Sequence, residues 1–540
     1  MQFPDYTATV PALIHSLAER FGERELMVLE ARRVTYAAVE ASSARVARGL
    51  LAAGISKGTR VGLLMPNGPD WLIAWLAASR IGALVVPINT FYQARELGWL
   101  LQHADIHTLL TSARFLNHDY LEQLETCVSG LAEQTQDILR LPSLPYLRAI
   151  YVWGECDHKW ARDGAALEAR GQADPVFDEA FLHAVERQVT PADSALIIYS
   201  SGSVSDPKGA IHTHGTLVQH SYQLAMMRDL TGEDRIWSPM PFFWVGGLIF
   251  AVMGTLHHGA SLILEDVFEP GRTLELLERE RVTVAAGWPH YGKALADHPS
   301  FKQRDLSSIR GGNIYALQPG PQIDPDLRGN SLGMTETCGP HTYSEGELPE
   351  ELRGSFGPAV AGLEHKVVDP DSGETLPRGE LGEICVRGYS LMQGLYKVER
   401  DQTLDADGYY HTGDMGYFDE NDILYFKARR GDMIKTGGAN VAPIEIENVL
   451  ESYSEIKEAY VVGIPDPARG QNVAAAVVLQ HGESLEAEPL RARLKRELAA
   501  YKVPRHIFFY PPQTLPFTDS GKIDKRKLEQ LLAGTSRPSV

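Results

Sequence analysis

A segment rich in serine and glycine, residues 199–210, follows directly on the apolar run 195–198. Such a run is typical of a buried strand, and small residues after it leave backbone N–H groups free to turn toward an anion. Serine hydroxyls and the ammonium of Lys208 add donors for phosphate oxygens. The segment therefore predicts a phosphate-binding loop at the end of a strand, with a nucleoside triphosphate as its ligand.

Other interpretations of this loop explain less of its composition. Counted from Gly202, the lysine has the offset of a Walker A motif, but Pro207 and Gly209 stand where that motif has a glycine and a hydroxyl. Ser205 and Lys208 have the Ser-x-x-Lys spacing of penicillin-binding enzymes, without their partner motifs at suitable places. A surface turn without function is the remaining alternative, which the loop alone leaves open.

Length and composition limit the classes of protein that fit. A chain of 540 residues exceeds what one hydrophobic core usually supports, so we expect two or more domains. Acidic residues outnumber basic ones by 70 to 51, which argues against nucleic acid as a partner. Four scattered cysteines predict neither a disulfide framework nor a zinc site, and the first residues lack the pattern of a secretory signal. We therefore expect a cytoplasmic protein.

Residues 236–264 contain no Asp, Glu, Lys or Arg. Pro239, Pro241 and the pair Gly246-Gly247 interrupt this segment, and its apolar part, 242–256, is shorter than the ~20 residues of a membrane span. The segment predicts a buried helix beside a ligand pocket, and no membrane span is expected.

The N-terminal part alternates short apolar runs with helical patterns. Runs at 61–65 and 83–87 flank a helix expected at 71–81, which is the order of βαβ units. Residues 141–145 and 163–174 have the composition of connections. This part predicts an α/β domain.

The pattern changes near residue 429. Beyond it, runs at 459–463 and 473–479 predict strands, and residues 484–500 and 525–532 predict surface helices. The sequence thus predicts a large N-terminal domain with βαβ sheets at 1–428, a hinge at 429–432, and a small C-terminal α+β domain at 433–540.

Four motifs follow the phosphate loop. They are Gly-Met-Thr-Glu-Thr at 333–337, Tyr-His-Thr-Gly-Asp at 410–414, Arg-Arg-Gly-Asp-Met-Ile-Lys at 429–435 and Ser-Gly-Lys at 520–522. In this order they resemble the motifs of the adenylate-forming superfamily, in its acyl-CoA synthetase branch, over almost the whole chain. The resemblance implies an AMP-forming acid–CoA ligase whose small C-terminal domain is mobile.

The resemblance implies a role for each motif in adenylation. Lys522 would bridge the carboxylate and the α-phosphate, while Thr335 would contact that phosphate and Glu336 would hold Mg²⁺. Asp414 would accept the ribose hydroxyls, assisted by Arg429. The implied nucleotide site comprises Ser200, Ser201, Gly202, Ser203, Val204, Ser205, Lys208, Asn330, Ser331, Leu332, Thr335, Asp414 and Arg429.

Each of these motifs, taken alone, also has a purely structural interpretation. Lys522 would be a solvated lysine in a basic tail, Thr335 the N-cap of a helix with Glu336 in its first turn, and residues 411–414 a turn. The catalytic roles therefore depend on the motifs occurring together.

The resemblance also implies a second half-reaction, which joins the acyl group to coenzyme A after the small domain has rotated. Gly431 stands at the implied pivot, where glycine tolerates two backbone conformations. Rotation would present Lys435, Gly437, Gly438 and Ala439 to the coenzyme A channel. The implied ligands are a carboxylic acid, ATP or acyl-AMP, coenzyme A and Mg²⁺, and a homodimer stays open.

A tryptophan points to a hydrophobic acid. Trp244 stands where acyl-CoA ligases often have histidine, and indole offers a large apolar surface with a single donor. A structural tryptophan in a core helix is the alternative. The expected acyl pocket comprises Trp244, Val245, Gly247, Gly312, Leu332, Gly333, Met334 and Cys338.

The chain departs from the family pattern near the nucleotide. Val204 replaces the usual threonine and Ser205 a frequent glycine, and a lost donor to a charged phosphate costs about 1.5–3 kcal/mol where that bond is made. Leu332 replaces an aromatic residue that often stacks on adenine. These departures keep open an enzyme that only transfers a preformed acyl-adenylate to coenzyme A, and Val204 keeps open a silent nucleotide-binding regulator. An acyl-AMP ligase that loads a carrier protein is a further alternative.

Overall fold

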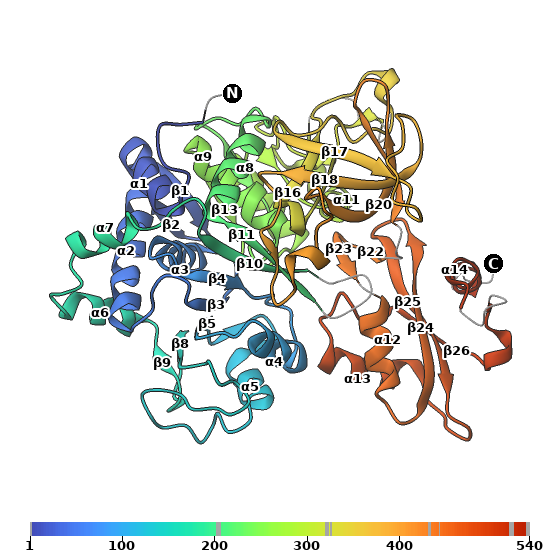
Figure 1. Cartoon of the computed structure of the whole chain (residues 1–540), viewed down its shortest axis with the longest axis horizontal. Helices are drawn as coiled ribbons and strands as arrows, with labels where there is room; N and C mark the ends of the chain where they lie inside the picture. The colour runs from blue at the N-terminus through green and yellow to red at the C-terminus, as the bar shows by residue number, and fades with distance from the viewer. Residues whose placement is uncertain are drawn as a thin grey trace.

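The computed structural model describes residues 3–200, 207–318, 323–324, 327–429, 434–441, 443–517 and 523–535. A large N-terminal part contains several sheets and most of the helices, and a smaller C-terminal part, drawn in orange and red in Figure 1, has a sheet of its own. This arrangement confirms the predicted α/β fold class, with a large domain followed by a small one.

The largest sheet has the strand order β19-β11-β10-β4-β3-β5-β8-β9. Neighbours from β10 to β9 run parallel, whereas β11 pairs antiparallel with both β10 and β19. The predicted runs 61–65, 83–87 and 195–198 fall in β3, β4 and β10. The strands are β3 (Arg60–Leu64), β4 (Leu84–Pro87), β5 (Thr108–Ser112), β8 (Ala149–Trp153), β9 (Arg162–Asp163), β10 (Ser194–Ser200), β11 (Lys208–Thr213) and β19 (Gly394–Leu395).

A second sheet has the order β14-β12-β13-β1-β2 and is parallel except where β2 pairs with β1. One hydrophobic core contains side chains from both sheets and the apolar faces of α1, α2, α3 and α8. The helix expected at 71–81 is α3, which is buried almost all round. The strands are β1 (Glu25–Leu29), β2 (Arg32–Thr35), β12 (Arg235–Trp237), β13 (Ser261–Leu264) and β14 (Val284–Ala285).

The helices of the large domain mostly follow strands of these two sheets. They are α1 (Val10–Phe21), α2 (Tyr36–Ala52), α3 (Pro69–Arg80), α4 (Ala94–His103), α5 (Tyr120–Cys127), α6 (Ala165–Ala173), α7 (Glu179–Glu186), α8 (His214–Met226), α9 (Gly254–His258), α10 (Pro270–Arg279) and α11 (Pro289–Ala296).

Residues 163–174, predicted to be a connection, instead contain helix α6. The helix lies so close to α2 that a Cβ at Gly49 would be 1.9 Å from the carbonyl oxygen of Leu167, and one at Gly171 would be 2.5 Å from the nitrogen of Gly49. Glycines on both helices thus permit a backbone contact that stabilises α6.

Antiparallel strands complete the large domain. Its third sheet has the order β17-β18-β20-β21, and β15 and β16 form a separate hairpin, as do β6 and β7. The strands are β6 (Arg114–Phe115), β7 (His118–Asp119), β15 (Ser331–Met334), β16 (Gly339–Tyr343), β17 (Leu363–Val368), β18 (Gly382–Gly388), β20 (Tyr410–Phe418) and β21 (Leu424–Arg429).

The small domain is built around the long hairpin of β24 and β25. Helices α12 and α13 pack on one face of its sheet and α14 packs on the other. The elements are β22 (Ile434–Thr436), β23 (Ala439–Val441), α12 (Pro443–Glu451), β24 (Ile456–Asp466), β25 (Gly470–Leu479), α13 (Ala487–Glu497), β26 (His506–Phe509) and α14 (Lys525–Thr535). Figure 1 shows α12 and α13 on the side of the sheet that faces the large domain.

The change of sheet falls where the sequence predicts the hinge. Strand β21 of the large domain ends at Arg429, and β22 of the small domain begins at Ile434. Gly431, the predicted pivot, lies outside the described residues.

The uncharged segment 236–264 contains a π-helix, η1 (Gly246–Met253), which continues into α9. Most of its side chains are buried in the core of the large domain, as predicted. Among the described residues, no helix combines the length and the apolar character that a bilayer crossing requires.

Candidate active site

A pocket of about 300 Å³ lies where the two domains meet. The large domain lines it with residues from the ends of β10 and β15 and the start of η1, and the small domain closes it. The predicted site residues that line it are Ser200, Trp244, Val245, Ser331, Gly333, Met334, Thr335, Gly438 and Ala439. Residues predicted for the nucleotide, the acyl group and coenzyme A thus come together in one cavity.

The phosphate loop joins two paired strands. Ser200 is the last residue of β10 and Lys208 the first of β11, and the two are direct partners across the strands. Ser200 lines the pocket, whereas Lys208 is exposed and does not. The loop residues Ser201, Gly202, Ser203, Val204 and Ser205 lie outside the described residues, so their contacts stay predictions, as does that of Lys522.

Thr335 and Glu336 lie in a short 3-10 turn after β15, where backbone contacts hold them in place. The imidazole of His212 donates from Nε2 to the carbonyl oxygen of Thr335 at 2.8 Å. Burial lowers the pKa of His212 to about 4, so the ring is neutral near pH 7. The N–H of Met392 donates to the carbonyl oxygen of Glu336 at 2.8 Å. The Glu336 carboxylate is thereby placed beside Ser200, with Oε1 3.5 Å from the serine Oγ.

The predicted ribose-binding pair belongs to adjacent strands. Asp414 of β20 is the backbone partner of Arg429 at the end of β21, so strand pairing brings the two residues together. Asp414 is buried, and its N–H donates to Thr412 Oγ1 at 3.0 Å. Asp414 does not line the pocket in this domain arrangement.

The side chains of β15 point alternately into the pocket and away from it. Ser331 and Gly333 line the pocket, whereas Leu332, predicted for both the nucleotide and the acyl sites, packs in a small core with Ile384 and Phe418. Successive side chains of a strand point to opposite faces, which explains the difference. Asn330 precedes the strand and also lies off the pocket.

Three residues predicted for the acyl pocket serve the packing of the large domain instead. A Cβ at Gly247 would be 2.0 Å from the carbonyl oxygen of Pro241. Gly312 has a positive φ of 104° and passes equally close to Ala285. Cys338 is fully buried in the core, where burial raises the pKa of its thiol to about 12. None of the three lines the pocket, so their assignment to the acyl site stays a prediction.

Aromatic side chains form the apolar wall of the pocket. The Trp244 ring lies 5.7 Å from the Trp288 ring and 5.8 Å from the Tyr501 ring, both edge to face. Phe250 and Met334 extend this surface. Aromatic edge-to-face contacts of this kind stabilise a wall that can contact an apolar substrate.

The segment predicted to face coenzyme A closes the pocket. Gly438 has a positive φ of 83°, and a Cβ there would be 2.2 Å from Cδ2 of Trp288. Only glycine allows this approach. Gly437 also has a positive φ, 57°, but it lies off the pocket, as does Lys435, whose Nζ is 5.0 Å from the centre of the Phe426 ring.

Sequence reasoning missed several lining residues. They are Asn89, Tyr92, Tyr199, Gly246, Phe250, Trp288, Gly339, Pro340, Tyr501 and Lys502. These residues come from distant segments, and no spacing in the sequence connects them. Three of them nevertheless stand in segments that the sequence singled out: Tyr199 opens the segment 199–210, and Gly246 and Phe250 lie in the uncharged segment that predicted a helix beside a pocket.

A second cavity of about 330 Å³ adjoins the first through Tyr501. Its lining contains Arg469 and Arg505 of the small domain, together with Phe91 of the large one. Burial and the neighbouring charge of Arg505 lower the pKa of Arg469. Two guanidinium groups side by side at a domain boundary favour an anion between the domains.

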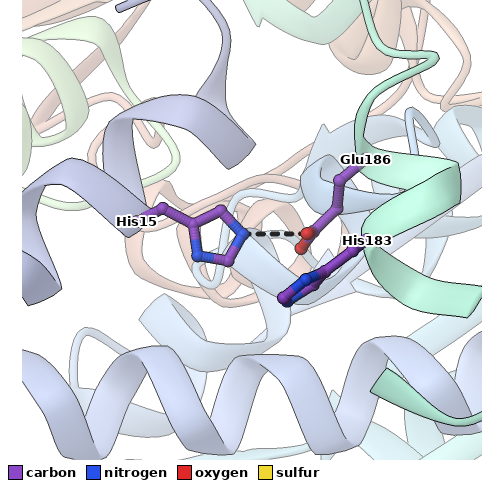
Figure 2. A group of neighbouring side chains, drawn as sticks. All are labelled: His15, His183 and Glu186. Carbon is purple, nitrogen blue, oxygen red and sulfur yellow. Dashed lines mark hydrogen bonds and ion pairs between the residues drawn. The ribbon is translucent and has the colours of Figure 1, made fainter. Parts of the chain in front are cut away.

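Figure 2 shows the one group among the described residues whose side chains are close enough to share a metal ion: His15, His183 and Glu186. Both carboxylate oxygens of Glu186 already have partners, because Oε1 accepts from Arg80 at 2.5 Å and Oε2 lies 2.8 Å from His15 Nε2. Helices α1 and α7, which carry the group, lie on the side of the large domain away from the small one (Figure 1). The group is therefore better explained as an ion-pair network than as a metal site.

Comparisons with known proteins relate the whole chain to one enzyme family. The family model "AMP-binding enzyme" matches residues 14–396, and "AMP-binding enzyme C-terminal domain" matches residues 445–522. The feruloyl-CoA synthase of Amycolatopsis sp is 32% identical over 528 residues, covering 96% of this chain and 96% of that protein. The mitochondrial medium-chain acyl-CoA ligase ACSF2 of Mus musculus is 29% identical, covering 97% and 87%. The structure of the amide bond synthetase McbA from Marinactinospora thermotolerans superposes with a TM-score of 0.78 at 26% identity, covering 96% and 99%.

Proposed function

Because the chain belongs to the AMP-binding enzymes and is an AMP-forming acid–CoA ligase, we propose that it activates a hydrophobic carboxylic acid as an acyl-adenylate and transfers the acyl group to coenzyme A. One observation carries the proposal: Ser200 and Thr335 share a pocket with Gly438 and with the aromatic wall around Trp244. Donors for a phosphate, an apolar surface and the glycine segment of the small domain meet there.

In the first half-reaction a carboxylate oxygen attacks the α-phosphorus of ATP, the new O–P bond forms, and pyrophosphate leaves. Negative charge builds up between two anions, so hydrogen-bond donors at the α-phosphate lower the barrier. We assign the hydroxyls of Ser200 and Thr335 to this task, with the loop 201–205 and Lys208 on the outer phosphates and Lys522 bridging the two reactants.

The residues around Glu336 fit a magnesium ion. Its carboxylate stands beside the hydroxyl of Ser200 at the edge of the pocket, and Mg²⁺ prefers hard oxygen ligands of this kind together with phosphate oxygens. When bound, the ion would neutralise part of the phosphate charge. Asp414 would accept hydrogen bonds from the ribose once the domains have rearranged.

In the second half-reaction the thiol sulfur attacks the acyl carbonyl carbon and a C–S bond forms. The thiol proton is released to solvent, and AMP leaves with the bonding electrons of the C–O bond. Gly438 packs directly against the Trp288 ring, which brings the glycine segment of the small domain up to the wall of the pocket. We assign Arg469 and Arg505, in the adjoining cavity, to the phosphates of coenzyme A.

The proposal is tested by incubating the purified protein with ATP, Mg²⁺ and coenzyme A and a panel of acids that includes octanoic and ferulic acid. We expect AMP and a thioester in equal amounts, detected by mass spectrometry, and faster turnover of apolar acids than of acetic acid. Absence of thioester with every acid, or preference for acetic acid, would contradict the proposal.

A matched pair of variants tests the role of Glu336. We expect Glu336→Gln to slow pyrophosphate exchange by about 100-fold or more, the effect typical of losing one preorganised charge-stabilising group. Glu351→Gln, at an exposed position, should leave the rate unchanged. Equal rates of pyrophosphate exchange in the two variants would show that Glu336 has no role in adenylation.

One observation favours a second candidate function. Val204 supplies no hydroxyl where the family usually has threonine, which suits an enzyme that receives a preformed acyl-adenylate. Such an enzyme would make thioester from synthetic octanoyl-AMP or feruloyl-AMP while showing no pyrophosphate exchange. Robust exchange with the free acid excludes this candidate.

A substrate series tests the two arginines. We expect Arg469→Gln and Arg505→Gln each to raise the KM for coenzyme A by about tenfold, the worth of one charge-assisted hydrogen bond, and to leave the KM for pantetheine unchanged. Arg496→Gln, on an exposed position of α13, is the matched control. Equal losses with coenzyme A and pantetheine would contradict a phosphate contact.

A further inference from the structure

A buried lysine joins the two domains beside the pocket. Lys502, which follows α13, is only 1% exposed. Its Nζ donates to Glu96 Oε1 at 2.9 Å and to Glu445 Oε1 at 2.7 Å. Glu96 belongs to α4 of the large domain, whereas Glu445 belongs to α12 of the small domain. Glu96, Lys502 and Glu445 are called the interdomain triad below, and α4 lies beside α13 in Figure 1.

Only one pair of the triad spans the domain boundary. Lys502 and Glu445 move together with the small domain, while Glu96 is fixed in the large domain, where its Oε2 also accepts the N–H of Gln93 at the start of α4. Burying an ammonium and a carboxylate costs the free energy of their hydration, and only their mutual pairing offsets that cost. The pair Glu96–Lys502 therefore favours the domain orientation that brings the two residues together.

The surroundings hold the ammonium in its charged form. Burial alone would lower the pKa of Lys502, but Tyr501, Glu96 and Glu445 hold it well above its ordinary value. The Nζ also lies 5.3 Å from the ring centre of Tyr92 in the large domain and 5.8 Å from that of Tyr501 in the small one. Both domains thus contribute to the environment of this one cation.

The triad is directly connected to the closure of the pocket. Next to Lys502, the hydroxyl of Tyr501 accepts a hydrogen bond from Asn89 Nδ2 at 3.1 Å. Tyr501 and Lys502 line the same pocket as Gly438 and Ala439 of the small domain, and Gly438 packs against Trp288 of the large one. The orientation that pairs Lys502 with Glu96 is therefore the one in which the glycine segment closes the site.

We propose that Lys502 is a positioning residue for thioester formation: by pairing with Glu96 it selects the domain orientation in which Gly438 and Ala439 close the pocket. The catalytic consequence rests on the proposed function. Ile523, the residue after Lys522, packs with α14 on the face of the small domain's sheet that is opposite α12 and α13, so we expect adenylation, which would use Lys522, to need another orientation. Loss of the pair should slow acyl transfer to coenzyme A and spare adenylation.

Two glutamine substitutions separate this role from simple stabilisation. Glu96→Gln breaks the pair between the domains and leaves Lys502 with Glu445, whereas Glu445→Gln breaks the pair within the small domain and leaves Glu96 in place. Amide hydrogen exchange followed by mass spectrometry reports domain contact without any substrate. We expect Glu96→Gln to raise exchange in residues 88–97 and 498–504, and Glu445→Gln to raise it in the small domain alone. Native-like protection of residues 88–97 in Glu96→Gln, or equal loss in both variants, would overturn the proposal.

The half-reactions give an independent readout with whichever of octanoic and ferulic acid the native enzyme ligates. We expect Glu96→Gln to slow single-turnover transfer from the corresponding acyl-AMP to coenzyme A by about tenfold or more, the effect of losing one buried charge pair, without slowing pyrophosphate exchange. Equal slowing of both half-reactions would overturn the positioning role. If the native enzyme ligates neither acid, the expected acid class is wrong. Amide hydrogen exchange, which needs no substrate, then decides by itself whether the pair of Lys502 and Glu96 holds the domains together.

Discussion

Two buried cations of this protein stand in nearly the same chemical setting and differ in what they connect. Arg80 is fully buried and bonds to Glu40 and Glu186, and Lys502 is almost as buried and bonds to Glu96 and Glu445. Every partner of Arg80 belongs to the large domain. The partners of Lys502 belong to different domains. A buried cation with two carboxylate partners therefore stabilises the large domain at Arg80. At Lys502 the same kind of ion pair forms only in one orientation of the two domains.

The two side chains also differ in how completely they satisfy their partners. The guanidinium of Arg80 offers separate donors to Glu186, to the side chain and carbonyl of Glu40 and to Ser43. Burial would raise the pKa of Glu186, but His15 and Arg80 hold it below its ordinary value. Glu96 shares one ammonium with a second carboxylate, and burial raises the pKa of its carboxyl group. Arginine suits a permanent network, and a shared lysine suits a contact that must break.

Removing the cation from the permanent network should have the largest effect on stability. We expect Arg80→Met to lower the free energy of unfolding of the large domain by about 3–5 kcal/mol, because it removes the guanidinium that pairs with the buried carboxylate of Glu186 and leaves that carboxylate with His15 alone. All eight tryptophans lie in the large domain, so tryptophan fluorescence during urea unfolding reports on that domain.

An exposed ion pair provides the control for Arg80. Arg32 bonds to Asp70 with both side chains about half exposed, and Arg32→Met should cost less than about 1 kcal/mol. A loss for Arg80→Met as small as that of the control would show that the buried network does not stabilise the large domain.

Removing the ammonium of Lys502 should affect the unfolding of the large domain much less than removing the guanidinium of Arg80. We expect Lys502→Met to change the tryptophan-monitored free energy of unfolding by less than about 1 kcal/mol, because Glu96 can regain water when the small domain moves away. Lys457→Met, at an exposed position of β24, is the matched control. A loss as large as that of Arg80→Met would make Lys502 a structural part of the large domain and remove the contrast between the two cations.

The sequence predicted the elements better than it predicted their contacts. Apolar runs and glycines indicated β3, β4, β10 and the buried helix at Gly246, because strand and helix periodicity are local properties. Helix α6 was missed because its stability comes from a glycine-mediated contact with α2, which no local pattern contains.

The site shows the same limit. Sequence motifs predicted Ser200, Thr335 and Gly438 as site residues, and all three line one cavity. Leu332 was predicted with them, but it points to the other face of β15 and packs in a small core. Lys502 carried no signal, since a lysine just after a charged surface helix is ordinarily solvated. Its burial arises only when two domains far apart in the sequence meet.

Acid should weaken the Arg80 network in a predictable direction. The lowered pKa of Glu186 means that the ionised carboxylate stabilises the fold above the ordinary glutamate range, and that this stability is lost as pH falls through the lowered pKa. The difference in unfolding free energy between the native protein and Glu186→Gln should therefore be larger at about pH 7 than at about pH 4. Urea unfolding at both pH values measures it, and a difference that grows in acid would contradict the assigned ionisation of Glu186.

An effect on domain contact smaller than that of Glu96→Gln should come from a neutral hydrogen bond next to Lys502. Tyr501→Phe removes the hydroxyl that accepts from Asn89, and one such hydrogen bond is worth about 0.5–1.5 kcal/mol, which corresponds to a severalfold shift in domain contact. Hydrogen exchange in residues 88–97 should rise by less than in Glu96→Gln, and Asn89→Ala together with Tyr501→Phe should add little to either change alone. An effect of Tyr501→Phe as large as that of Glu96→Gln would assign the domain contact to the tyrosine and its aromatic neighbours. The ion pair of Lys502 would then be a consequence of the domain contact and not its cause. An ammonium that is buried in an interface needs a carboxylate partner there even where another contact selects the orientation.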